Sequence, residues 1–357
     1  MDGRMHAHCD VVSRLRMASR SATGALRALW RLEQPRVHHH VRSNAGFLVC
    51  IGGLAIRMEC FAVEKDGFYG FLHEPTTGPS PDGEFSGRFT GKALIVLGGS
   101  EGNENIPRNL GARFAREGVA ALGLCYWNVP GLPDELVEVP VESVERACAL
   151  LRSRGYERIG IYGISKGGEL ALLAASLMPD LTCAVALSPL DHVMPGITGS
   201  GGLASKGVST RSSWTWRGES LGCAPGGIRL PYLGIIRRMI TERQLDMRFV
   251  YERMLEGASA TSAIKVERIN GPVMLISPEH DAMWPSDEAC RRIERRLRAQ
   301  DHPWEVARVT YEHASHIMVP METDMLRLFR EERRFPQECS TSREDAFRRT
   351  LAFLEQW

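Results

Sequence analysis

Three side chains that together could form and hydrolyse an acyl-enzyme follow one another in this sequence. Ser165 lies in a Gly-x-Ser-x-Gly pattern at residues 163–167, Asp281 ends the run Pro-Glu-His-Asp, and His316 ends the run Tyr-Glu-His-Ala-Ser-His. A serine hydroxyl becomes a nucleophile when a histidine accepts its proton and a carboxylate orients that histidine. We therefore predict Ser165 as the nucleophile, His316 as the general base and Asp281 as the orienting acid.

The sequence around Ser165 predicts the sharp turn that such a nucleophile requires. The apolar segment 159–162 has the character of a buried strand, and residues 166–178 follow the serine as a helix. A strand, a tight turn and a helix in this order are typical of a nucleophile elbow. Glycines at 163 and 167 permit the strained turn, and the start of the helix adds partial positive charge where an oxyanion would form. The alternative is an ordinary serine in a glycine-rich turn.

The predicted acid and base each follow a predicted parallel strand. Asp281 comes after the strand at 273–276, and His316 comes after the strand at 304–309. Because the carboxyl ends of parallel strands meet at one edge of a sheet, both side chains should reach the edge that carries Ser165.

Other residues compete for these roles. His313 lies three residues before His316 in the same loop, and Asp191 follows another predicted strand, where some hydrolases place the acid. We favour His316 over His313 and Asp281 over Asp191. The amine of Lys166 is a further candidate base, but its backbone N–H is better placed, because the residue after the nucleophile donates to the oxyanion.

The second oxyanion donor is expected from the loop after the apolar strand at 93–97. This loop, Gly-Gly-Ser-Glu-Gly at 98–102, is bare enough for backbone amides to approach a ligand closely. We predict the backbone N–H groups of Ser100 and Lys166 as the oxyanion hole, with the N–H of Glu101 as the next choice. A plain tight turn is the alternative.

From residue 58 onward, segments with strand character alternate with segments of helical periodicity. Strands are expected at 58–63, 69–73, 93–97, 120–125, 159–162, 182–187, 273–276 and 304–309, and helices at 107–117, 141–154, 166–178, 286–299 and 343–355. The first two strands flank a Lys-Asp-Gly turn and predict a hairpin. We therefore predict an α/β fold with a mostly parallel, twisted sheet and helices on both faces.

Residues 191–265 interrupt this alternation and predict a lid-like insertion. Glycine and serine crowd 196–210, Trp214 and Trp216 follow, and a helical stretch is expected near 235–255. Excursions between strands commonly carry substrate-binding walls. Trp214 and Trp216 are therefore candidates for a substrate wall, and the alternative is a structural loop anchored by two tryptophans.

Five motifs occur in an order that resembles one known family. They are Leu-Gly-Gly-Ser-Glu-Gly at 97–102, Val-Pro-Gly-Leu-Pro at 129–133, Tyr-Gly-Ile-Ser-Lys-Gly-Gly-Glu-Leu at 162–170, Ser-Ser-Trp-Thr-Trp at 212–216 and Trp-Pro-Ser at 284–286. Over about residues 58–357 the chain resembles the C-terminal catalytic domain shared by acyl-CoA thioesterases and bile-acid-CoA:amino-acid N-acyltransferases, itself similar to dienelactone hydrolase. The resemblance implies an α/β-hydrolase fold and a triad of serine or cysteine, aspartate and histidine, which matches Ser165, Asp281 and His316.

The resemblance also implies a substrate class. It favours hydrolysis of acyl-CoA thioesters. The enzymatic alternatives are hydrolysis of carboxylic esters or lactones and transfer of the acyl group to an amino acid. The non-enzymatic alternative is a catalytically silent binding module. The acyltransferase branch uses a cysteine nucleophile, so Ser165 favours hydrolysis. Two features depart from the family pattern. Residues 1–57 are too few for the immunoglobulin-like sandwich of animal members, and His280 stands where a second acidic residue is common.

Residues 1–57 differ in composition from the rest of the chain. They contain nine arginines and three acidic residues. We expect a disordered extension, or a start placed upstream of the true one, before a catalytic domain at 58–357. A basic amphipathic helix at 13–32 would instead fit a transit peptide or a membrane-surface segment. The three histidines at 38–40 could bind metal but are more often solvated.

The overall composition excludes several classes of protein. The net charge is +1, which argues against nucleic acid or an anionic membrane as a general partner, and no apolar run reaches the roughly 18 residues of a spanning helix. The nine cysteines are scattered and form no Cys-x-x-Cys pair, which suits reduced thiols. We expect a cytoplasmic enzyme with a small acyl thioester or ester substrate and no cofactor or metal. The sequence leaves the oligomeric state open.

Overall fold

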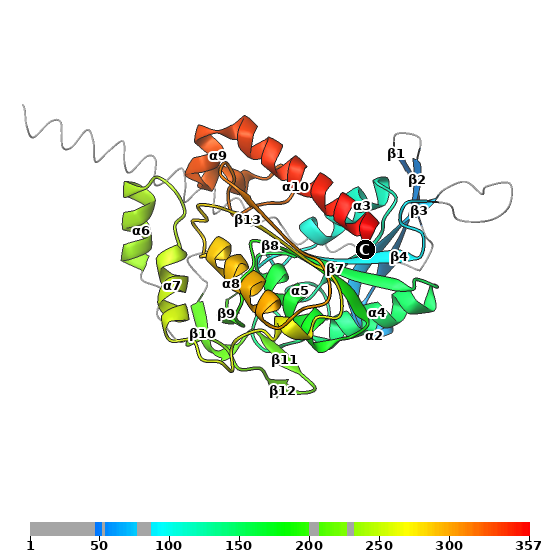
Figure 1. Ribbon diagram of the computed structural model, residues 1–357, viewed down its shortest axis with the longest axis horizontal. Coiled ribbons are helices and arrows are strands. Elements are labelled where there is room, and N and C mark those ends of the chain that lie inside the picture. The colour runs from blue at the N-terminus through cyan, green and yellow to red at the C-terminus, as the bar shows by residue number, and fades with distance from the viewer. Residues whose placement is uncertain (1–46, 52–53, 77–86, 200–206, 227–231) are drawn as a thin grey trace, which may run out of the picture.

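The central element of the computed structural model is a twisted sheet covered by helices on both faces (Figure 1). The structure describes residues 47–51, 54–76, 87–199, 207–226 and 232–357. The predicted helix at 13–32 and the histidines at 38–40 lie outside these ranges. Within them the sheet has nine strands, in the spatial order β1 (Phe47–Ile51), β2 (Leu54–Phe61), β3 (Tyr69–Thr76), β5 (Ala120–Cys125), β4 (Lys92–Leu97), β7 (Arg158–Ile164), β8 (Leu181–Leu187), β13 (Val273–Pro278) and β14 (Val306–Tyr311).

The strands from β5 to β14 are parallel, whereas β1, β2 and β3 pair antiparallel at the other edge. β4 and β5 are buried along their whole length, as expected for apolar strands covered on both faces. The mostly parallel α/β-hydrolase architecture predicted from the sequence is confirmed.

Helices cover the two faces of the sheet in separate groups. One face carries α3 (Asn105–Arg116) and α10 (Pro336–Gln356), whose Phe114 and Phe347 rings lie 4.9 Å apart. The other face carries α4 (Glu142–Ser153), α5 (Lys166–Leu177) and α8 (Ser286–Ala299), which pack into a second apolar core. Figure 1 shows the two groups on opposite sides of the strands.

The N-terminal edge of the sheet begins earlier than the sequence pattern indicates. The predicted hairpin is present as β2 paired with β3, and the helical turn α2 (Val63–Asp66) lies in the connection. β2 starts at Leu54, four residues before the predicted Met58, and β1 pairs with it at the edge. The alternation of apolar and polar residues is short in this part of the sequence, so the start of β2 could not be recognised from it.

The segment 191–265 leaves the main sheet between β8 and β13. It contains β9 (Pro195–Thr198) paired with β10 (Gly207–Ser212), β11 (Trp214–Trp216) paired with β12 (Glu219–Ser220), and the helices α6 (Tyr232–Thr241) and α7 (Arg248–Glu256). β11 also pairs with β6 (Val139–Pro140), which ties the segment to the rest of the protein.

Candidate active site

Ser165 lies in the tight turn between β7 and α5. Its backbone has φ 57° and ψ −121°, a conformation that costs free energy and that the surrounding contacts hold in place. Its N–H donates to the carbonyl of Leu187 at 2.8 Å. A Cβ at Gly163 would lie 2.0 Å from the carbonyl oxygen of Gly167, and a Cβ at Gly167 would lie 2.0 Å from that of Gly98. Both glycines are therefore required by the close approach of strand, turn and helix.

The structure brings the three predicted residues into one hydrogen-bonded row. The Nε2 atom of His316 lies 2.8 Å from the Oγ atom of Ser165, and its Nδ1 atom lies 3.0 and 2.8 Å from the two carboxylate oxygens of Asp281. Asp281 and His316 are buried, whereas Ser165 is partly exposed. A base with a serine on one side and a carboxylate on the other has the geometry to accept the hydroxyl proton. The catalytic roles of the three residues remain predictions.

Asp281 is held by two donors, one from the segment before α8 and one from the first residue of α8. Its Oδ1 atom accepts the backbone N–H of Met283 at 2.9 Å, and its Oδ2 atom accepts the hydroxyl of Ser286 at 2.6 Å. These bonds fix the carboxylate opposite the imidazole. The sequence indicated Ser286 only as part of the Trp-Pro-Ser motif at 284–286, and its contact with the acid becomes evident in the structure.

The loop that carries His316 is fastened to the end of β8 by Ser188. The Ser188 hydroxyl donates to the carbonyl of His316 at 3.0 Å, and the Ser188 carbonyl accepts the indole N–H of Trp284 at 2.9 Å. The Trp284 ring meets the His316 ring edge-on, with centroids 5.4 Å apart. Ser188 is fully buried and has φ 44°. It links the loop of the acid to the loop of the base.

The rival acid and base lie outside this row. The Nδ1 atom of His313 lies 2.8 Å from Glu331, which raises the pKa of that histidine. Asp191 accepts two hydrogen bonds from the Arg292 guanidinium, at 2.6 and 2.8 Å. That guanidinium lowers the pKa of Asp191 to about 2, against the opposing effect of burial. His280 is exposed.

The predicted oxyanion loop passes directly beside Ser165. A Cβ at Gly99 would lie 3.3 Å from the Ser165 Cβ, so a side chain at this position would crowd the nucleophile. The Tyr126 hydroxyl donates to the carbonyls of Gly98, at 3.0 Å, and Gly99, which holds the loop from behind. Burial raises the pKa of Tyr126 well above its usual range, so the hydroxyl stays protonated. The donor roles of the Ser100 and Lys166 N–H groups remain predictions.

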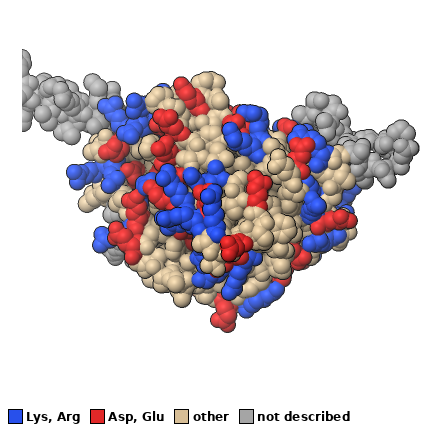
Figure 2. Space-filling model, in the orientation of Figure 1, with Lys and Arg blue, Asp and Glu red and all other residues tan. Residues whose placement is uncertain are grey.

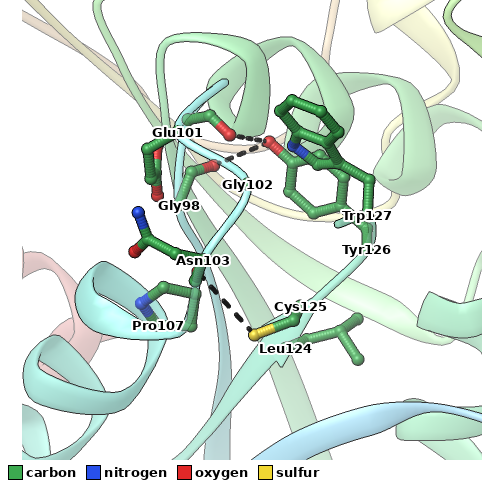
Figure 3. A pocket seen from close by; sticks show the side chains of 10 residues that line it. Gly98, Glu101, Gly102, Asn103, Pro107, Leu124, Cys125, Tyr126 and Trp127 are labelled. Carbon is green, nitrogen blue, oxygen red and sulfur yellow. Dashed lines mark hydrogen bonds between the residues drawn. The ribbon is translucent and has the colours of Figure 1, made fainter. Parts of the chain in front are cut away.

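Figure 3 shows a small pocket between this loop and the residues at and after the end of β5. Its lining includes Glu101, Tyr126 and Trp127, and the Tyr126 hydroxyl points toward the loop carbonyls. Asn128 fixes the end of the loop by donating from its side-chain amide to the carbonyl of Gly102 at 2.8 Å. The predicted oxyanion loop is thus held by polar contacts from the segment that follows β5.

The side chain of Lys166 belongs to a buried ion pair. Its ammonium donates to both carboxylate oxygens of Glu169 at 2.9 Å, and Glu169 also accepts the Met194 backbone N–H at 3.1 Å and the Trp214 indole N–H at 2.7 Å. Burial lowers the pKa of Lys166, while Glu169 favours its charged form. This amine is engaged away from the Ser165 hydroxyl, which favours the backbone role predicted for Lys166.

The two candidate wall tryptophans occupy different environments. Trp214 is fully buried and anchors the insertion to α5 through Glu169, so it cannot line a surface open to substrate. Here the alternative of an anchoring tryptophan is correct. Trp216 is partly exposed and lies beneath the Arg217 guanidinium, 4.3 Å from the ring centroid. The role of Trp216 stays a prediction.

A narrow, mainly apolar crevice lies where α7 faces the hairpin of β9 and β10. It is lined by Lys166, Met194, Pro195, Ile197, Val208, Tyr251 and Met254. Tyr251 meets Trp284 edge-on, with ring centroids 5.2 Å apart. Apart from Lys166, these lining residues could not be identified from the sequence, because they come together from α5, β9 and the residue before it, β10 and α7.

Charges on the face drawn in Figure 2 are of mixed sign. The arginines of α8 are largely matched by acids: Arg291 pairs with Asp287, and Arg296 pairs with Glu267. In the described part of the chain, no cluster of three or more His, Cys, Asp or Glu side chains could hold a metal ion. Among those same residues, no helix has the length and apolar character needed to cross a membrane.

Comparisons with known proteins match part of this chain. A family model described as BAAT / Acyl-CoA thioester hydrolase C terminal matches residues 230–356. Human acyl-coenzyme A thioesterase 1 is 29% identical over 191 residues, which are 51% of this chain and 39% of that protein. Human mitochondrial acyl-coenzyme A thioesterase 2 is 29% identical over 191 residues, 51% of this chain and 34% of that protein. The predicted resemblance to acyl-CoA thioesterases is confirmed, and the matched region spans less than half the length of these relatives.

Solved structures with similar folds are more distant in sequence. An esterase from Pyrococcus furiosus is 15% identical with a TM-score of 0.44, covering 91% of this chain and 99% of the esterase. A dienelactone hydrolase-like promiscuous phosphotriesterase from metagenomic libraries is 13% identical with a TM-score of 0.47. The match covers 85% of this chain and 98% of the phosphotriesterase.

Proposed function

We propose that this protein is a serine hydrolase that cleaves acyl-CoA thioesters to free acid and CoA through an acyl-enzyme on Ser165. The observation that supports this most strongly is the row of hydrogen bonds from Ser165 through His316 to Asp281. The strained elbow around Ser165 and the similarity to acyl-coenzyme A thioesterases support it further.

The first step forms the acyl-enzyme. The Oγ atom of Ser165 attacks the thioester carbonyl carbon as the Nε2 atom of His316 takes the hydroxyl proton, and Asp281 holds the resulting imidazolium at its Nδ1 side. The backbone N–H groups of Ser100 and Lys166 donate to the oxyanion of the tetrahedral intermediate. When the C–S bond breaks, His316 returns its proton to the departing CoA thiolate.

The second step regenerates the enzyme. Water enters the place that the thiol has left, and His316 removes a proton as the water oxygen attacks the ester carbonyl. The intermediate collapses with cleavage of the bond to the Ser165 Oγ atom, which regains its proton from His316. The products are a carboxylic acid, free CoA and unchanged enzyme.

Water is proposed as the acceptor because the acyl-enzyme is an oxygen ester. An ester of this kind beside a general base is well placed for hydrolysis, whereas a cysteine thioester reacts more readily with amines. The buried thiols of Cys148 and Cys183 are not alternatives at this position, since they lie on α4 and β8 and burial raises the pKa of both.

The test is a substrate panel with purified wild-type protein and Ser165→Ala. Acetyl-CoA, octanoyl-CoA and palmitoyl-CoA are compared with nitrophenyl esters, with and without excess glycine or taurine. Thioester hydrolysis to free acid that disappears in Ser165→Ala is expected. Amide as the major product would show that the protein is an acyltransferase and not a hydrolase. Hydrolysis of the nitrophenyl esters without hydrolysis of the thioesters would overturn the proposed substrate class.

A further inference from the structure

Glu169 is a fully buried carboxylate that the proposed mechanism does not use. It lies in the first turn of α5, and its backbone N–H donates to the carbonyl of Ser165 at 3.0 Å. Its Oε1 atom accepts the Met194 backbone N–H at 3.1 Å and the Trp214 indole N–H at 2.7 Å, and both carboxylate oxygens accept the Lys166 ammonium at 2.9 Å. These bonds fix the carboxylate, because losing one of them would leave a buried polar group unpaired.

The contacts of Glu169 reach the elbow through Lys166. Lys166 directly follows Ser165, and its backbone N–H is one of the two predicted oxyanion donors. Its side chain extends along α5 to Glu169, three residues further on, and both side chains are buried. A buried carboxylate alone would oppose the negative charge of an oxyanion nearby, and the ammonium offsets that charge. The ion pair can therefore hold the start of α5 without adding net charge beside the nucleophile.

The contacts of the same carboxylate reach the predicted oxyanion loop through two aromatic rings. The Trp214 ring, whose indole N–H the carboxylate accepts, meets the Tyr126 ring edge-on with centroids 5.4 Å apart. The Tyr126 hydroxyl donates to the carbonyls of Gly98, at 3.0 Å, and Gly99 (Figure 3). Ser100, whose backbone N–H is the second predicted donor, comes next in the chain. Both rings are buried, so this row of contacts leaves the loop little room to move relative to α5.

We propose that Glu169 is a positioning residue that keeps the predicted backbone donors of Ser100 and Lys166 aligned for the oxyanion. The inference rests on the proposed function and adds a residue that acts through others without touching substrate. The two donors lie on separate segments, the loop after β4 and the start of α5, so their alignment requires contacts between these segments. The segments are also closely packed, since a Cβ at Gly167 would lie 2.0 Å from the carbonyl oxygen of Gly98. A small shift of either segment would misplace a donor.

The test is Glu169→Gln, assayed with octanoyl-CoA and with octaneboronic acid as inhibitor. Glutamine is similar in size, but its NH₂ group would face the Lys166 ammonium, donor against donor. We expect kcat to fall roughly 10- to 100-fold with KM little changed, less than the roughly 10²–10³-fold loss on removal of a donor. The boronic acid forms a tetrahedral adduct with Ser165 that places one oxygen in the oxyanion hole. Its inhibition constant should therefore rise by a factor similar to the fall in kcat.

Asp191→Asn is the matched control, because it also removes a carboxylate paired with a cation. Asp191 accepts the Arg292 guanidinium at 2.6 and 2.8 Å, away from the contacts of Glu169. Urea denaturation should show a lower free energy of unfolding for this variant, while kcat and the inhibition constant stay within about twofold of wild type. Trp214→Phe provides a second variant in case Glu169→Gln does not fold. It removes only the indole donor and should shift kcat and the inhibition constant severalfold, by similar factors.

The possible outcomes separate the positioning role from the proposed function. Wild-type inhibition constants in every folded variant of Glu169 and Trp214, with wild-type protein hydrolysing octanoyl-CoA, would overturn the positioning role and leave the proposed function intact. A rise of the inhibition constant in Asp191→Asn equal to that in Glu169→Gln would also overturn it, because loss of stability would then be the cause. Failure of wild-type protein to hydrolyse any acyl-CoA of the substrate panel would instead overturn the proposed function.

Discussion

Two substitutions of Ser188 should distinguish its role in positioning His316 from its contribution to the stability of the fold. The Ser188 hydroxyl donates to the His316 carbonyl at 3.0 Å, in a fully buried position. Ser188→Ala and Ser188→Gly both remove this donor but differ in backbone strain, because φ at this position is 44°. Glycine adopts this conformation freely, whereas alanine does not.

The magnitudes follow from these contacts. Loss of the hydroxyl forfeits a hydrogen bond and leaves a buried carbonyl without its donor, which lowers the free energy of unfolding of Ser188→Ala by about 1–3 kcal/mol. In Ser188→Gly the relief of strain, about 1–2 kcal/mol, is partly cancelled by the greater chain entropy of glycine, about 0.5–1 kcal/mol. The glycine variant should therefore be as stable as the alanine variant or slightly more stable.

The loss of kcat should depend on the missing Ser188 hydroxyl and should not track the difference in stability between the two variants. Without the tether, the His316 loop samples positions in which Nε2 is too far from the Ser165 Oγ atom. We expect kcat for acyl-CoA hydrolysis to fall roughly tenfold in both variants, equivalent to about 1.4 kcal/mol, with KM little changed. The assays are steady-state kinetics and urea denaturation of each variant. Wild-type kcat in Ser188→Gly, or kcat that rises and falls with stability, would refute the positioning role.

Three further predictions address the base, the elbow and the pH dependence of stability. His316→Ala should lower kcat by about 10⁴-fold, as Ser165→Ala does, whereas His313→Ala should change it less than tenfold; the reverse order would reassign the base. Gly167→Ala should lower kcat at least 100-fold, because its Cβ would meet the Gly98 carbonyl at 2.0 Å. Gly155→Ala, with open space at φ 88°, should cost only about 1 kcal/mol of stability and keep full kcat; equal kcat losses would show that the turn is not the cause. Burial lowers the pKa of His73 to about 4, so the unfolded chain, with a histidine pKa near 6.5, binds the proton first as pH falls. Unfolding free energy should therefore decrease by up to about 3 kcal/mol between pH 6.5 and pH 4, and urea titrations of His73→Phe should show a shallower decline; an identical decline in both proteins would exclude His73 as its source.

The sequence predicted the elements that depend on local pattern. The apolar strands of the parallel sheet were recognisable because burial on both faces requires a continuous run of apolar residues. The helix that begins at Ser286 was recognisable from the helical periodicity of its apolar residues. The row of Ser165, His316 and Asp281 could be anticipated because each residue follows a strand, and parallel strands end at one edge of the sheet.

Features that depend on contacts between distant segments were not predictable in the same way. Trp214 has the composition expected of a binding wall, and only the tertiary position of Glu169 shows that its indole is an anchor. Ser188 carries no motif, and its importance comes from a carbonyl 128 residues away. The N-terminal start of β2 was also missed, because pairing with β3 extends the strand past its recognisable pattern.

Labelling with a fluorophosphonate probe tests most directly whether Ser165 is an activated nucleophile. Wild-type protein, Ser165→Ala and His316→Ala are incubated with the probe, digested and analysed by mass spectrometry to locate the adduct. The proposed mechanism predicts one labelled peptide that contains Ser165 in wild-type protein, no label in Ser165→Ala, and labelling slowed by several orders of magnitude in His316→Ala. Equal labelling of Ser165→Ala, or hydrolysis by wild-type protein that persists after treatment without any adduct on Ser165, would contradict it.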